Sequence, residues 1–191
     1  MAYIGQAPAN KPLGASDITD GIISVAKLTS TLDLSSNTVT LPSGVGGKVL
    51  QVVQTVKTDT FSTTSTSMTD VTGLSASITP SSSSNKILVN ANFSSSTSAD
   101  SRVNVFNLLR GSTTIAQPSG SGGFKGTRQG YIINNGNLIT VDFNFLDSPS
   151  TTSATTYKIQ MYVNGDTGYV GDRSADDFDN ISTITLMEIS A

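Results

Sequence analysis

Aspartates are the side chains in this sequence that come closest to a catalytic or metal-binding arrangement. Four of them fall within one short segment and are the candidate ligands for Ca²⁺: Asp172, Asp176, Asp177 and Asp179. Asp142 and Asp147 offer carboxylates of the type that glycosidases use in pairs. The spacing of the four aspartates fits no EF-hand loop, and acidic loops are usually only solvated. We therefore predict no catalytic residue, no metal and no cofactor, and expect that the protein is not an enzyme.

The residue types that are missing narrow the function further. The sequence has no histidine and no cysteine, so a Ser-His-Asp triad, a thiol nucleophile, an ordinary zinc site and a disulfide are all excluded. The net charge is −3 with 11 basic residues, which predicts no nucleic-acid partner. No apolar stretch approaches the roughly 18 residues of a membrane span, and the first residues do not resemble a signal peptide. We expect a binding or structural protein without membrane insertion.

Aromatic and polar residues in or directly after two loops, of which the first is Gly-rich, are the candidates for a binding surface. The first predicted loop covers residues 117–130, and the second covers residues 164–180. The candidates are Phe124, Lys125, Arg128, Gln129, Tyr131, Tyr169 and Arg173. Flat aromatic faces can pack on a sugar ring, and the polar side chains can donate to hydroxyls or carboxylates. The alternative is that both segments are plain loops with an aromatic residue tucked in.

The elements that must hold these loops are predicted to be β-strands. Ile, Val and Thr are abundant, and such β-branched residues favour strands. Alternating apolar residues recur from residue 46 onward, for example over 87–93, 157–163 and 182–189, and no helical period occurs there. Asn134-Asn135-Gly136-Asn137 predicts a hairpin between two of the strands. Eight to ten strands within residues 46–191 predict an all-β head, an antiparallel β-sandwich or jelly roll.

Two of the expected strands, residues 102–110 and 182–189, are apolar on both faces. In a lone two-layer sandwich, one face of each strand should meet water. The predicted explanation is contact with other copies of the chain, through Phe106, Leu108, Leu186, Met187 and Ile189. The alternative is that a few apolar residues are simply tolerated on the surface.

Residues 1–45 differ from the rest of the chain in composition and in the pattern of their apolar residues. They mix glycine, proline and short apolar clusters without a sustained period, which predicts an extended segment with short helical turns. Residues 32–34 and 39–41 alternate around a Ser-Ser-Asn turn, but two such short strands cannot fold stably alone. The domain boundary is therefore placed between residues 45 and 46. We expect the first segment to depend on copies of itself or on a host surface.

The sequence also resembles a known family along nearly its whole length. Residues 1–5 (MAYIG) and 15–28 (ASDITDGIISVAKL) look like the start of tail-fibre-like virion appendage proteins of marine tailed phages. Residues 34–42 (LSSNTVTLP) resemble the short trimeric linker of such fibres. Residues 47–53, 71–74, 77–81, 84–89, 145–149 and 182–189 look like their C-terminal heads. These motifs are structural, so no binding residue is carried over from the family.

The resemblance implies a homotrimer with a head similar to the tumour-necrosis-factor-like jelly roll. It further implies a virion protein assembled in the cytoplasm of the bacterial host, with residues 1–45 attaching to other virion proteins. We expect a tail fibre or appendage whose tip contacts a host-surface glycan or protein. A capsid head fibre or decoration protein without a receptor is the alternative, and a polysaccharide depolymerase is a third. The sequence does not separate the first two.

Overall fold

The computed structural model describes residues 48–135, 137–172 and 179–191. The predicted segment 1–45, with its helical turns, lies outside the described residues. The described part of the chain consists of these β-strands: β1 (Val49–Lys57), β2 (Phe61–Thr63), β3 (Thr69–Ile78), β4 (Lys86–Thr97), β5 (Arg102–Arg110), β6 (Thr113–Ile115), β7 (Arg128–Ile132), β8 (Ile139–Asp147), β9 (Thr155–Val163), β10 (Gly168–Val170) and β11 (Ser182–Ile189). It contains no helix that is long and apolar enough to cross a membrane.

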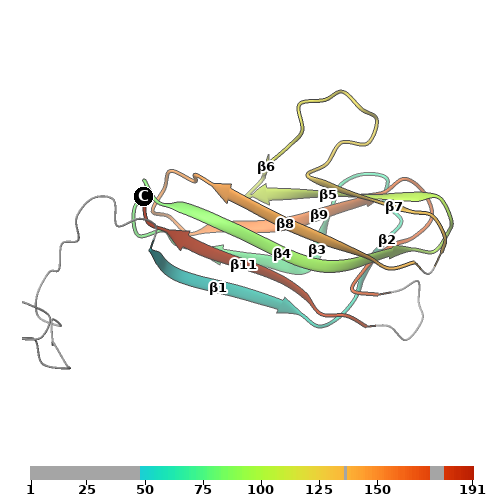
Figure 1. Ribbon diagram of the computed structural model, residues 1–191, viewed down its shortest axis with the longest axis horizontal. Helices are drawn as coiled ribbons and strands as arrows, with labels where there is room; N and C mark the ends of the chain where they lie inside the picture. The colour runs from blue at the N-terminus through green and yellow to red at the C-terminus, as the bar shows by residue number, and fades with distance from the viewer. Residues whose placement is uncertain (1–47, 136, 173–178) are drawn as a thin grey trace, which may run out of the picture. The chain divides into compact units, whose positions relative to one another are not determined.

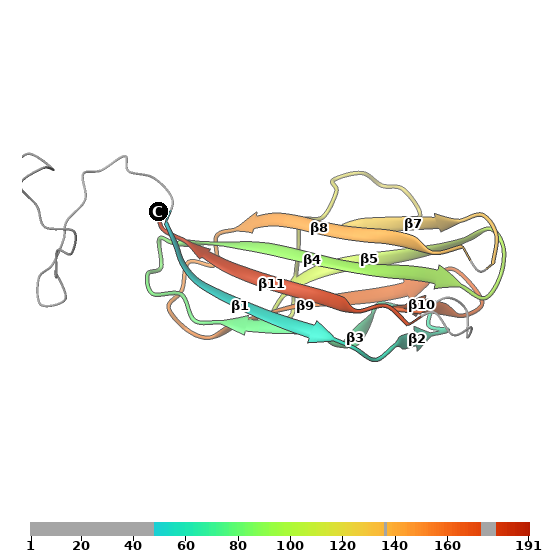
Figure 2. The ribbon, with the colours of Figure 1, turned by 60° about the horizontal axis from the view of Figure 1, so that its bottom comes forward.

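The strands form two antiparallel sheets that face each other (Figures 1 and 2). In the first sheet, here called sheet A, β1, β11, β4 and β8 lie side by side. The strand β10 pairs with the last three residues of β4, and β2 pairs with β10. In the second, sheet B, the order is β3, β9, β5, and then β6 and β7 along one edge of β5. Each sheet thus interleaves early and late strands, which is the topology of a jelly roll. The prediction of an all-β antiparallel sandwich is confirmed.

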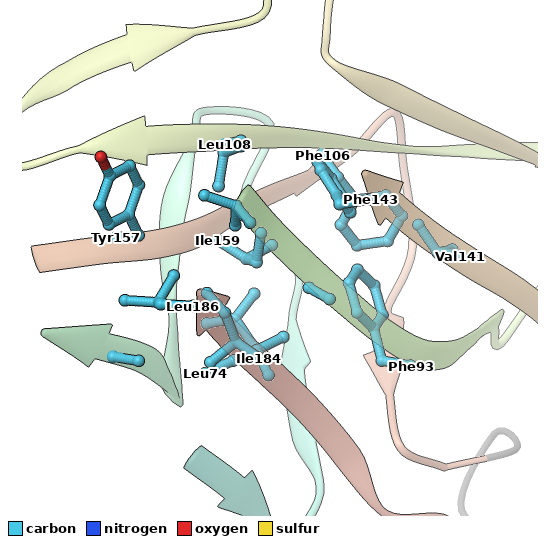
Figure 3. Packing of buried hydrophobic residues seen from close by; sticks show 14 of the residues in the cluster. Leu74, Phe93, Phe106, Leu108, Val141, Phe143, Tyr157, Ile159, Ile184 and Leu186 are labelled. Carbon is cyan, nitrogen blue, oxygen red and sulfur yellow. The ribbon is translucent and has the colours of Figure 1, made fainter. Parts of the chain in front are cut away.

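The core fills the space between the two sheets (Figure 3). Alternate residues of each strand point inward, as the period of two predicted. Phe93 of β4 lies between two other rings, with its centroid 5.0 Å from that of Phe106 and 6.0 Å from that of Phe143. Edge-on and offset ring contacts of this kind favour one packing arrangement over others. The core therefore fixes the sheets on which the surface residues stand.

Three of the five residues predicted for a subunit interface belong to this core. Phe106, Leu108 and Leu186 are 0% exposed and point toward the opposite sheet (Figure 3). Their place in an interface is therefore wrong. Met187 and Ile189 are half-buried on the outer face of sheet A. The sequence pattern had shown two apolar faces but not which of them was the inner one.

The second apolar face of β5 is already covered within one chain. Val105 is fully buried, although it points away from the core. A Cβ added to Gly126 would come within 2.3 Å of Val105 Cγ1, so the backbone of the segment before β7 lies directly on this valine. β5 therefore does not need another copy to cover this face, because its own chain supplies the cover, and the sequence-based prediction is wrong here.

Local predictions around β7 need two further corrections. The Asn-Gly segment does not close a hairpin, because β7 pairs with β5 in sheet B and β8 pairs with β4 in sheet A. The turn instead carries the chain from one sheet to the other. Arg128 and Gln129 lie in β7 and not in a loop. The short strands β2 and β10 were not predicted, since three residues show no period.

Candidate binding surfaces

One end of the head receives the chain and the other end carries interlocked loops. Lys48 and Ser190 lie side by side, with the Ser190 amide donating to the Lys48 carbonyl at 3.0 Å. At the opposite end, the turns β4–β5, β7–β8 and β9–β10 come together (Figures 1 and 2). The two ends of the sandwich therefore differ: one carries the first and last described residues, and the other carries these connecting turns.

The distal turns are tied to one another by specific hydrogen bonds. The amide of Ser98 donates to the Thr167 carbonyl at 2.9 Å, and that of Ser101 donates to the Ile133 carbonyl at 3.1 Å. The Asp100 carboxylate accepts the Asn135 amide at 2.6 Å. Turns that are held this way lose little conformational entropy on binding.

The segment between β6 and β7 projects from sheet B and is anchored at both of its ends (Figure 1). Gln117 Nε2 donates to Asn107 Oδ1 at 2.6 Å. Thr127 Oγ1 accepts the Leu108 amide at 3.1 Å, and Gln129 Nε2 donates to the Phe124 carbonyl. The predicted loop residue Gln129 therefore holds the loop from the adjacent strand.

Phe124 and Tyr131 are the aromatic residues that the structure places on the surface of this region. Phe124 is 44% exposed and Tyr131 is 59% exposed. Tyr131 stands on the outer face of sheet B, two residues beyond Gln129, which contacts the Phe124 backbone. Lys125 is exposed beside Phe124. These residues remain available to an external ligand.

Arg128 contributes to structure as well as to the surface. Its Nε donates to the Asp142 carbonyl at 2.8 Å, and Nη1 donates to the Thr127 carbonyl at 3.2 Å. Its guanidinium carbon lies 5.9 Å from the centroid of the Phe143 ring. Arg128 thus connects β7 to β8 across the side of the sandwich, and its removal would disturb both strands.

Replacing Gly126 with alanine should displace the projecting segment. The new Cβ would meet Val105 Cγ1 at 2.3 Å and the Phe106 carbonyl oxygen at 2.8 Å, so backbone must shift. We expect a loss of about 1–3 kcal/mol in the free energy of unfolding, measured by urea denaturation. Gly122→Ala is the matched control, because nothing lies within 4 Å of its added Cβ. Equal stabilities for the two variants would contradict the close contact.

The second predicted loop does not join the first. Tyr169 is half-buried in β10 of sheet A, and Ser95 Oγ donates to its carbonyl at 2.7 Å. Arg173 lies outside the described residues. Tyr162, which sequence reasoning overlooked, is half-buried in β9, directly across β5 from Gln129, because Val105 pairs with both residues. Burial raises the pKa of Tyr162. Its outward position follows from the alternation along β9, so the signal was present in the sequence.

The acidic candidates are only partly described. Asp172 is buried and Asp179 is exposed, whereas Asp176 and Asp177 lie outside the described residues. Within residues 48–135, 137–172 and 179–191, no group of three or more acidic side chains could hold a metal ion. Asp142 and Asp147 point to opposite faces of β8 and therefore do not form a catalytic pair.

Asp147 lies in a buried polar cluster that connects three strands. Tyr157 of β9 donates its hydroxyl to Asp147 Oδ2 at 2.7 Å, and Arg110 Nη1 of β5 lies 2.8 Å from the same oxygen. Burial raises the pKa of Tyr157, and the neighbouring carboxylate raises it further. The hydroxyl therefore stays protonated as a donor, and these groups stabilise the fold.

The outer face of sheet A carries a shallow depression of about 300 Å³ that sequence reasoning missed. It lies over β11, β4 and β8. Its lining is mostly amide and hydroxyl side chains: Asn90, Asn92, Asp142, Asn144, Thr183 and Thr185, with Ala91 and Phe143 beneath them. Asn92 Nδ2 donates to Asp142 Oδ1. Each residue is unremarkable in sequence, and only the strand register brings them together.

No protein-family model and no curated protein matches the chain. The chain is similar in structure to infectious bursal disease virus Gt strain, with 13% identity over 80% of this chain and 44% of that chain, at a TM-score of 0.40. The Gx strain matches with 12% identity over 81% of this chain and 41% of that chain, at a TM-score of 0.41. The T=1 particles derived from infectious bursal virus match with 14% identity over 84% of this chain and 42% of that chain, at a TM-score of 0.38. This chain thus spans less than half of those viral chains. At these TM-scores the likeness adds nothing to the topology described above.

Proposed function

We propose that this chain is a structural virion protein, a homotrimeric appendage of a tailed phage that is assembled in the cytoplasm of its bacterial host. Residues 1–45 attach it to other virion proteins, and residues 46–191 form the displayed head. The observation that carries this proposal is that the two ends of the head differ. Lys48 and Ser190 lie together at one end, and the hydrogen-bonded turns lie together at the other. The fibre-like segments of the sequence, residues 1–5, 15–28 and 34–42, support the same reading.

Antibody-gold labelling of intact particles tests where the protein is attached. Label on the tail or its fibres is the expected result. Label on capsid faces or vertices would overturn the tail assignment in favour of a capsid head fibre or decoration protein. Particles without label would contradict a virion role altogether. Turnover of host polysaccharide by the purified chain would instead favour a depolymerase.

A host-surface glycan is the ligand that the outer side of sheet B fits best. Phe124 and Tyr131 present apolar ring faces to solvent, and Gln129 fixes the Phe124 backbone beside them. Exposed rings on a fixed backbone can stack on sugar rings at little entropic cost. A trimer would carry three such surfaces, so weak individual contacts would gain by avidity.

Particles that carry Phe124→Ala together with Tyr131→Ala should adsorb to host cells at least about tenfold more slowly, because each trimer would lose six ring contacts at once. Adsorption is measured as the decline of free particles after mixing with cells. Ile133→Ala is the control, since Ile133 is equally exposed nearby but has no ring. An unchanged rate for the double variant, with the protein still present on particles, would contradict receptor contact at this surface.

A further inference from the structure

We propose that the outer face of β1, β11, β4 and β8 is the contact surface between copies of this chain. The proposal rests on the homotrimer of the proposed function for the number of copies, and it adds the surface through which they meet. It replaces the core residues Phe106, Leu108 and Leu186 with residues that the fold exposes. Only Met187 and Ile189 are retained from the sequence-based prediction.

An apolar row crosses all four strands of this face. Val52 pairs with Met187, Met187 pairs with Leu88, and Leu88 pairs with Leu146. Direct partners in neighbouring strands point to the same side of a sheet. Val52 is 57% exposed and Leu146 is 47% exposed, although both stand on a regular sheet. Leu88 and Met187 between them are half-buried, and an apolar row with exposed ends on a charge-poor surface indicates an interaction site.

The next row along the strands consists of amides and hydroxyls. It contains Gln54, Thr185, Asn90 and Asn144, which are again direct partners across the strands. Gln54 Nε2 donates to Thr185 Oγ1 at 2.8 Å. Among the described residues, the side-chain amides of Asn90 and Asn144 have no hydrogen-bond partner. Both line the depression, so donors and acceptors there are open to a ligand.

These rows suit another copy of the same chain better than an unrelated partner. A rotation axis along the strands brings equal rows of neighbouring copies to the same height. Apolar residues then meet apolar residues, and amides meet amides. An amide carries both a donor and an acceptor, so identical asparagines can pair with one another, whereas identical charges would repel.

Charge is almost absent from this face. Its outward residues include one cation, Lys86, in the row of Ile189, and one anion, Asp142, in the row of Asn92. The two central rows carry no charge. Interface centres are depleted in charged residues because desolvating an unpaired charge is costly.

The area of the face is of the order that one partner buries in a protein–protein contact. Four strands are about 19 Å wide at ~4.8 Å per strand, and eight residues are about 26 Å long at ~3.3 Å each. Side-chain relief increases the accessible area of this patch beyond the resulting ~500 Å², toward the ~800 Å² that each partner buries in a standard interface.

Cysteine crosslinking in the full chain tests this surface directly, because the natural sequence contains no cysteine. Val52→Cys with Leu146→Cys places thiols on the two outer strands of the face. Within one chain they are three strands apart, about 14 Å, which is too far for a disulfide that needs Cα atoms within about 7 Å. Mild oxidation should therefore give covalent dimers and trimers on a denaturing gel. The control is Tyr131→Cys with Ser77→Cys, on the outer strands β7 and β3 of sheet B, which should give no crosslinked species.

Light scattering supplies a second, independent measurement. The full chain should have a mass three times 19.8 kDa, and Leu146→Asp should reduce it toward 19.8 kDa, whereas Ile133→Asp should not. A single-chain mass for the natural protein would overturn the proposal. It would not affect the virion role, which the labelling experiment tests separately. A multimeric mass that persists in Leu146→Asp, with no crosslink from the Val52/Leu146 pair, would also overturn it and would place the contact elsewhere.

Discussion

Replacing Asp147 with alanine should lower the free energy of unfolding by about 3 kcal/mol, among the largest losses from a single polar substitution in the head. The carboxylate accepts the Tyr157 hydroxyl at 2.7 Å and forms two contacts with Arg110 Nη1, at 2.9 and 2.8 Å. Its removal leaves the buried hydroxyl and a partly buried cation without their acceptor. Urea denaturation at a fixed chain concentration measures the loss.

Asp70→Asn is the matched control for this prediction. Asp70 also pairs with a cation, Lys158, at 2.7 Å, but it does so on the surface. The hydrogen bonds from Lys158 and Gln160 lower the pKa of Asp70. An exposed pair contributes less than about 1 kcal/mol. Equal losses for Asp147→Ala and Asp70→Asn would show that burial of the Asp147 cluster does not determine its contribution.

Glu188 should make the stability of the head depend on acidity. The side chain is almost fully buried at the end of β11. Burial alone would raise its pKa, but hydrogen bonds from Asn85, Gln51 and Ser81 together outweigh burial and lower the pKa to about 2. The carboxylate therefore stabilises the folded state fully above its ordinary pKa of 4.5, and this contribution is lost as the pH falls from 4.5 toward 2.

The Glu188→Gln variant separates this contribution from other effects of acid. At pH 6 the free energy of unfolding of the variant should be about 2–3 kcal/mol lower than that of the natural chain. A neutral amide replaces a charged acceptor there, and its NH2 group faces the groups that donate to the natural carboxylate. The difference should shrink as both proteins are unfolded at lower pH. A difference that stays constant between pH 6 and pH 2.5 would contradict the role of the charged carboxylate.

The sequence predicted the strands well wherever alternation ran long enough to be recognised. Residues 87–93 and 157–163 lie in β4 and β9, and the predicted strand 182–189 coincides with β11. The strands β2 and β10 were not predicted, because a three-residue strand has no measurable period. The Asn-Gly turn was misassigned because turn chemistry specifies a change of direction, whereas strand pairing is decided by partners distant in sequence.

The surface residues were harder to predict than the fold. Alternation identifies two faces of β5 and β11 but does not say which face meets the opposite sheet, so Phe106, Leu108 and Leu186 were assigned to the wrong side. Glu188, next to the chain's last residues, gave no sign in sequence that Asn85 and Ser81 would enclose it. The amide row of sheet A is visible only once the register of four strands is known.

The way β6 and β7 share one edge of β5 has an evolutionary consequence. Each strand keeps its own register with β5, and the connection between them leaves the sheet and returns to it. Gln117 at its start and Gly126 near its end are held in place, which leaves residues 118–123 without a contact that a change of length would break. Insertions and deletions there should be inherited without loss of the scaffold. A lineage could therefore change the shape and chemistry of this exposed loop by editing six residues, while the rest of the head is passed on intact.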